Sequence, residues 1–202
     1  TWFMAAFLFV SKKEMLSAGG LKKHLKISSY RTALLLHRKL LRKTEGLMQC
    51  LDTNIKNIEV EAFPLPSQIM GEGSENFKIL GIVRHSAMRS GKTKKYFEFK
   101  LTKNISADVA NTLKEISSHI VVTSRTLRNI RGIVPIAESK DRCLETAYKK
   151  FLDTLRSVHK KILIKNASGY LGSFCYHYNI YRSSSPMLHM QILLGIIPPK
   201  SA

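Results

Sequence analysis

The pattern of hydrophobic and polar positions between residues 17 and 44 predicts two helices joined by a tight turn. The first helix covers 18–25 and has Ser17 as its N-cap. The second begins near residue 30, after a turn at 26–29, and continues to about residue 44. Apolar and weakly polar side chains recur along one face of this second helix at helical spacing, namely Ala33, Leu36, His37 and Leu40.

The opposite face of the second helix is basic, because it carries Arg31, Arg38, Lys39 and Arg42. A helix-turn-helix needs an apolar inner face, a polar turn and a basic outer face to lay its second helix against DNA phosphates and base edges. We therefore predict a helical DNA-binding region over residues 1–50, with contacts from these four side chains and from Ser29. The alternative is a basic helical hairpin whose lysines and arginines are only solvated.

The middle of the chain alternates between apolar and polar residues, as β-strands do. In the first such segment, Glu59 and Glu61 fall on the same face. Three consecutive strands, a helix, a strand and further helices are in the order of a ribonuclease-H-like core, although many α+β domains share that order. The predicted elements are strands at 58–63, 77–85 and 96–101, a helix at 107–117 capped by Ser106, and a buried strand at 119–124.

The fold class predicted from this order is α+β. An N-terminal helix-turn-helix over 1–50 would precede a ribonuclease-H-like mixed sheet with C-terminal helices over 51–202. In such a core, acidic residues on the first strand, the fourth strand and a later helix hold two divalent metal ions for phosphoryl transfer.

The net charge of +19, with a pI near 10, favours a nucleic acid, or less often an anionic membrane surface, as the partner, and does not distinguish DNA from RNA. The apolar run 2–10 is too short to span a bilayer, so we expect a core helix there and no membrane. Cys50, Cys143 and Cys175 lie far apart, which argues against a zinc site and a disulfide scaffold. We expect a cytoplasmic, nucleoid-associated protein, and because Thr1 is not a methionine we also expect the natural N-terminus to lie before it.

Several segments, in their order and spacing, resemble the ISXO-like insertion-sequence transposases. They are Trp2-Phe3, 11–13, 21–25, 28–40 with its Thr-Ala and His-Arg pairs, the strands 58–62 and 77–83, and the aromatic helix 170–179. In that helix Gly172 and Ser173 replace the usual acidic stretch, and a zinc ribbon would precede Thr1. The resemblance implies a DDE-type nuclease and strand transferase that uses Mg²⁺ or Mn²⁺ and acts on DNA as an oligomer.

The catalytic positions implied by the resemblance are Glu61, Ser124 and Glu145, where the family carries acidic residues. Glu61 could still bind a metal ion, as could Glu145, although a glutamate in place of aspartate moves its oxygens by about 1 Å and such misplacement can cost about 100-fold in rate. The neutral hydroxyl of Ser124 is a poor ligand for Mg²⁺, which prefers carboxylate and water oxygens. Alternatively, Glu61 is a solvated strand residue and Glu145 a helix N-terminal acid stabilised by the dipole.

The predicted function is DNA binding by a transposase-like protein with impaired DDE catalysis. A second basic helical face, with Lys149, Lys150 and Arg156, would add sequence-independent contacts to the DNA backbone. One alternative is an active, metal-dependent transposase that cleaves and joins transposon ends. The other is a non-enzymatic nucleic-acid-binding protein, including one bound to RNA.

Overall fold

The computed structural model describes residues 1–12, 15–48, 55–66, 76–87, 93–114, 119–122, 142–158, 162–180, 190 and 193–195, and it has an α+β fold. Among these residues the helices are α1 (Trp2–Ser11), α2 (Ala18–Leu25), α3 (Tyr30–Met48), α5 (Ile105–Lys114), α6 (Cys143–Val158), the 3-10 turn η2 (Ile164–Asn166) and α7 (Ala167–Ile180). The strands are β1 (Ile55–Pro64), β2 (Lys78–Ala87), β3 (Thr93–Thr102) and β4 (His119–Val122).

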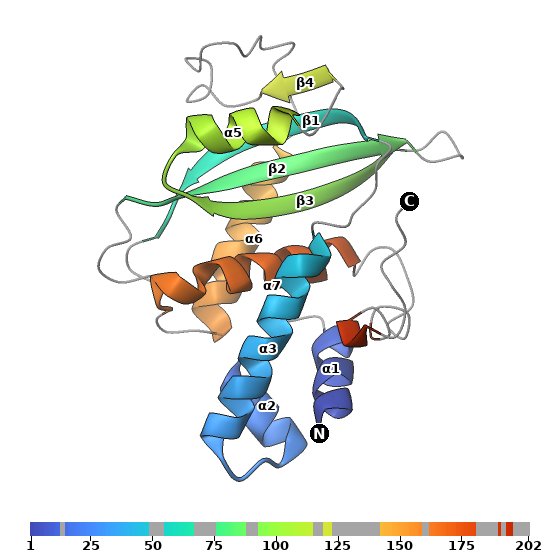
Figure 1. The fold of residues 1–202 in the computed structure, drawn as a ribbon, viewed down its shortest axis with the longest axis vertical. Coiled ribbons are helices and arrows are strands. Elements are labelled where there is room, and N and C mark those ends of the chain that lie inside the picture. The colour runs from blue at the N-terminus through green and yellow to red at the C-terminus, as the bar shows by residue number, and fades with distance from the viewer. Residues whose placement is uncertain are drawn as a thin grey trace.

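The four strands form one sheet in the order β3-β2-β1-β4, in which β4 is parallel to β1 and the other pairs are antiparallel. α5 lies on the side of the sheet away from α6 and α7 (Figure 1). The register directs alternate residues of each strand to the two faces. The face toward α6 and α7 carries Phe63, Ile79, Val83, Phe97 and Phe99, all buried in the main core cluster.

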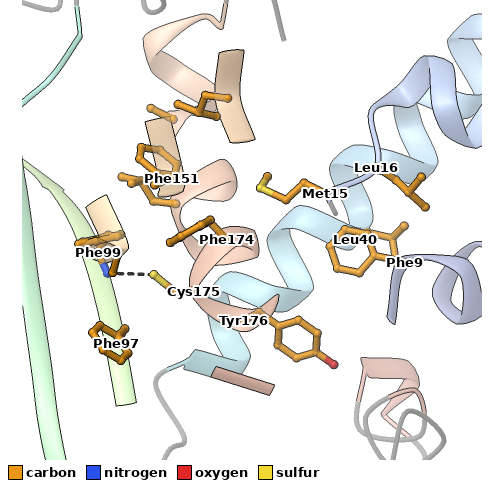
Figure 2. Packing of buried hydrophobic residues seen from close by; sticks show 14 of the residues in the cluster. Phe9, Met15, Leu16, Leu40, Phe97, Phe99, Phe151, Phe174, Cys175 and Tyr176 are labelled. Carbon is orange, nitrogen blue, oxygen red and sulfur yellow. Dashed lines mark hydrogen bonds between the residues drawn. The ribbon is translucent and has the colours of Figure 1, made fainter. Parts of the chain in front are cut away.

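β3 is an edge strand of this sheet, and α7 supplies partners to its outer backbone groups. The Asn179 side chain accepts a hydrogen bond from the Phe97 N–H (2.7 Å) and donates one to the Phe97 carbonyl (2.7 Å). One turn earlier, the Cys175 sulfur accepts the Phe99 N–H at 3.1 Å (Figure 2). An edge strand otherwise leaves such groups unpaired, so α7 takes the place of a neighbouring strand.

α3 packs closely along α7 because Gly169 has no side chain at the crossing. A Cβ at Gly169 would lie 3.2 Å from the Leu41 Cβ. Beside this contact the rings of His37 and Tyr170 lie 5.7 Å apart. Buried residues of α1 and α3, such as Phe9 and Leu40, therefore belong to the same core cluster as those of the sheet and α7. One continuous core draws on both sides of residue 50.

The helical hairpin of α2 and α3 follows the expected pattern. The Ser17 hydroxyl accepts the Gly20 N–H at 3.0 Å, which confirms Ser17 as the N-cap of α2. Lys26 ends the helix in the left-handed conformation (φ 52°), and the Ile27 N–H bonds to the Lys22 carbonyl at 3.1 Å. On the expected inner face of α3, Ala33, His37 and Leu40 are buried, whereas Leu36 is partly buried.

The predicted cap of the helix after β3 is wrong. α5 begins at Ile105, and the Asn104 side chain accepts the Ala107 N–H at 3.2 Å. Ser106 lies inside the first turn, because Asn104 already provides an equally good capping oxygen. Of the predicted strand 119–124, β4 accounts for 119–122, and Thr123 and Ser124 lie outside the described residues.

No helix in the part of the chain that the structure describes combines the length and the apolar composition needed to cross a membrane. Four of the ten residues of α1 are buried within the protein, namely Ala5, Ala6, Phe9 and Val10. The apolar run near the start of the chain is therefore a core helix, as predicted.

Replacing Asn179 with alanine should lower the free energy of unfolding by roughly 2–4 kcal/mol, because it leaves two buried backbone groups of Phe97 without partners. Chemical denaturation of the variant measures this loss. Asn111→Ala is the matched control, since Asn111 is exposed on α5. Equal stability of the two variants would show that the Asn179 amide does not hold α7 to the sheet.

Candidate functional site

Three carboxylates gather where the start of α6 crosses β1. Glu59 and Glu61 lie on the β1 face that α6 covers, and Glu145 lies in the first turn of α6. Burial raises the pKa of Glu61, and the charges of Glu145 and then Glu59 raise it further. The first and third acidic positions expected from the sequence are therefore close enough in space to interact electrostatically.

Gly81 allows α6 to come this close to the sheet. It pairs with Glu61 across the β1–β2 ladder. A Cβ at Gly81 would lie 2.9 Å from the Phe63 ring, 3.0 Å from the Phe99 ring and 3.1 Å from a methyl group of Leu144. Because Leu144 occupies the space above Gly81, the next residue of α6, Glu145, is held near Glu61.

Each of the other two carboxylates has a partner of its own. The Lys149 Nζ lies 2.8 Å from the Glu145 Oε1, and its hydrogen bond and positive charge lower the pKa of Glu145. Glu59 is buried, with its Oε1 2.9 Å from the His85 Nε2 and its Oε2 3.7 Å from the Cys143 sulfur. Glu61, by contrast, has no ion pair among the described residues.

Glu59 is the member of this cluster that was not predicted as a site residue. The signal was present, because alternation along β1 places Glu59 on the same face as Glu61. Nothing in the sequence indicated that His85, from β2, and Cys143, from α6, would meet it there.

The arrangement provides part of what a divalent metal ion needs. Two of the three predicted positions, Glu61 and Glu145, lie together, whereas Ser124 is outside the described residues. Within the described ranges no three histidine, cysteine, aspartate or glutamate side chains are placed to hold one metal ion. Those residues do not by themselves form a metal site.

The basic residues of α6 have partners within the chain. Lys149 pairs with Glu145, and the Arg156 guanidinium lies 3.7 Å from an Asp153 oxygen. The Lys150 ammonium lies 5.6 Å from the centre of the Tyr178 ring. All three side chains are exposed, so these contacts are weak ones.

On α3 the predicted basic residues divide between two directions. Arg31, Arg38 and Arg42 follow one another at spacings of seven and four residues, which places them on one line along the helix, here called the arginine stripe. Lys39 turns toward α1, with its ammonium 4.5 Å from the centre of the Trp2 ring. Ser29 caps α3 weakly, through a 3.4 Å bond from the Thr32 N–H.

The arginine stripe is exposed, and no carboxylate whose side chain the structure describes pairs with it. Leu35, which is 59% exposed, interrupts the stripe between Arg31 and Arg38. His37 and Leu40 are buried on another face of α3, whereas Leu41, beside the stripe, contacts Gly169 at the start of α7.

No family model, no curated protein and no solved structure matches this chain.

Replacing Glu61 with glutamine should raise the melting temperature near neutral pH. The pKa of Glu61 is higher in the folded than in the unfolded chain, so ionisation increasingly disfavours the fold as the pH rises above 4.5. The gain should vanish below that pH, where parent and variant are both neutral at this position. Thermal unfolding of parent and variant, from below pH 4.5 to neutral pH, measures this difference in melting temperature.

Asp153→Asn is the control, because it removes one negative charge from a side chain that is 75% exposed. An equal response of the two variants, or a gain for Glu61→Gln that persists at low pH, would contradict the coupling between β1 and α6.

Proposed function

We propose that this protein binds duplex DNA through the arginine stripe of α3, and that it belongs to a transposase lineage whose DNA-cleaving chemistry is impaired. The observation that carries the proposal is the exposed arginine stripe on an amphipathic helix of a chain with net charge +19.

The hairpin of α2 and α3 supports this proposal by its geometry. α2 packs against α3, and the turn between them is short and fixed by the left-handed Lys26. In a helix-turn-helix the second helix lies in the major groove while the first crosses the backbone. α3 would take the second role, with Arg31, Arg38 and Arg42 directed at phosphates and base edges. Phosphate contacts of this kind make binding strong and salt-dependent.

The lineage is supported by the sheet. The sheet has three antiparallel strands, and after a helix comes a fourth strand that is parallel to the first. Ribonuclease-H-like cores have the same strand order. The proximity of Glu61 on β1 to Glu145 on α6 also matches the expected placement of first and third acids. This proximity favours, as a second candidate function, an enzyme that still cleaves DNA.

Impaired cleavage is proposed from the identity of the second position. Ser124 supplies a neutral hydroxyl where an acid would help to neutralise two metal ions. Glu61 is one methylene longer than the aspartate that the family carries. Neither change affects DNA binding by α3, so binding would outlast catalysis.

Neutralising the arginine stripe should weaken duplex binding strongly. We expect Arg31→Gln/Arg38→Gln/Arg42→Gln to lower affinity by roughly 100-fold or more, and to reduce the slope of log K against log salt by about 2–3. Fluorescence anisotropy with a short duplex, over a series of salt concentrations, measures both quantities.

The matched control is Lys149→Gln/Lys150→Gln/Arg156→Gln, which removes the same charge from α6. An equal loss of affinity in the two triple variants would show that binding depends on net charge alone and not on the arginine stripe. Binding of an RNA of the same length with equal affinity at equal salt would favour the RNA-bound alternative.

Nicking of supercoiled DNA in Mg²⁺ or Mn²⁺ tests the impaired catalysis. We expect no nicking by the parent, and metal-dependent nicking by Glu61→Asp/Ser124→Asp, because two aspartates restore the ligands that the chemistry requires. Adding Glu145→Ala to that double variant should abolish the activity. Nicking by the parent that disappears in Glu145→Ala would show instead that catalysis survives.

A further inference from the structure

A basic pocket lies where the arginine stripe meets the start of α7. Its volume is about 480 Å³, and its lining comes from two segments more than a hundred residues apart in the sequence. The lining residues are Arg38, Leu41, Arg42, Lys165, Asn166, Ser168 and Gly169.

The pocket exists because α3 and α7 touch at one point and diverge beside it. Leu41 rests on Gly169, which has no side chain to separate the helices. Arg38 and Arg42 lie three residues before and one residue after Leu41 in α3, so their side chains border the space beside this contact. Lys165, in η2, borders it from the other side.

The chemistry of the lining is that of an anion site. It holds three cationic side chains and no carboxylate. No ion pair joins Arg38, Arg42 or Lys165 to a carboxylate whose side chain the structure describes. Asn166 and Ser168 are partly buried and add neutral hydrogen-bonding groups.

A phosphate group suits this lining better than a carboxylate. Guanidinium groups bind phosphate through two parallel hydrogen bonds, and a lysine adds a mobile point charge. A backbone phosphate carries the same single charge as a carboxylate but has four oxygens instead of two, so it can contact three cationic side chains at once. A volume of about 480 Å³ can also accept the sugar attached to a backbone phosphate.

We propose that this pocket is a phosphate-binding site in which Arg38, Arg42 and Lys165 hold one backbone phosphate of bound DNA. This inference rests on the DNA binding proposed above and adds a positioning contact from outside the helix-turn-helix. Because α7 is bonded to β3 through Asn179 and Cys175, a phosphate held here would fix the DNA relative to the sheet and its carboxylates.

The first arm of the test uses inorganic phosphate at constant ionic strength. In the parent protein, backbone amide resonances of 165–169 should shift and saturate, whereas Lys165→Gln should lose most of that response. No shift at 165–169, or an identical shift in Lys165→Gln, would overturn the site. Lys165 is exposed, so this substitution leaves the fold intact.

The second arm uses a short DNA duplex. Lys165→Gln should weaken binding roughly 5- to 20-fold and reduce the salt slope by about one. Lys78→Gln, at an exposed residue of β2, is the charge-matched control and should change affinity less than about two-fold. Equal effects of the two substitutions would overturn the pocket and leave DNA binding by α3 unaffected.

A third variant blocks the pocket without a change of charge. Ser168→Trp should lower the affinity for the duplex about as much as Lys165→Gln does. Ser106→Trp, on the exposed face of α5, should leave that affinity unchanged. If the parent binds phosphate at 165–169 but no duplex, the DNA proposal fails and free phosphate becomes the ligand. A response to polyglutamate without one to phosphate would overturn the phosphate assignment.

Discussion

The hydrogen bonds between Asn179 and the backbone of Phe97 are the contact on which the arrangement of this protein depends. They fasten α7 to the open edge of the sheet, where the amide acts as a short piece of neighbouring strand. Phe174 of the same helix stacks on Phe99 of the sheet and meets the Phe151 ring edge-on (Figure 2). α7 then carries α3 on its other side through Gly169. The position of the basic helix relative to the sheet therefore follows from one side-chain amide and one missing side chain.

The same architecture separates opposite charges into two regions. Glu59, Glu61 and Glu145 meet where α6 covers the sheet, at the close approach that Gly81 permits. The arginine stripe and Lys165 gather at the crossing of α3 and α7. A polyanion on the basic region would be attracted there and repelled from Glu61, the one of the three carboxylates without an ion pair among the described residues. Cleavage at the carboxylates would thus require divalent cations to offset that repulsion, which is why loss of an acidic ligand at Ser124 weighs so heavily in the proposed function.

Local patterns in the sequence predicted the elements well, and they did so for physical reasons. The period of apolar residues in α3 and the capping oxygen of Ser17 are properties of short segments, as is the alternation that sets Glu59 and Glu61 on one face of β1. The pairing of Asn179 with Phe97 could not be predicted, because it joins residues 82 positions apart and an isolated asparagine on a helix carries no sign of its partner. The basic pocket could not be predicted for the same reason, because Lys165 and Arg42 come together only after α3 and α7 pack. The prediction of Ser106 as the cap of α5 was a local error, because Asn104, two residues earlier, supplies the capping oxygen.

Arginine-selective chemical footprinting of the protein, free and bound to a short duplex, tests the central claim of DNA binding by α3 most directly. Arg31, Arg38, Arg42 and Arg156 are all exposed in the free protein, so each can react. The account predicts that the duplex protects the three arginines of α3 and leaves Arg156 as reactive as before. Protection of Arg156 with unchanged reactivity along α3 would contradict it and move the DNA-binding surface to α6.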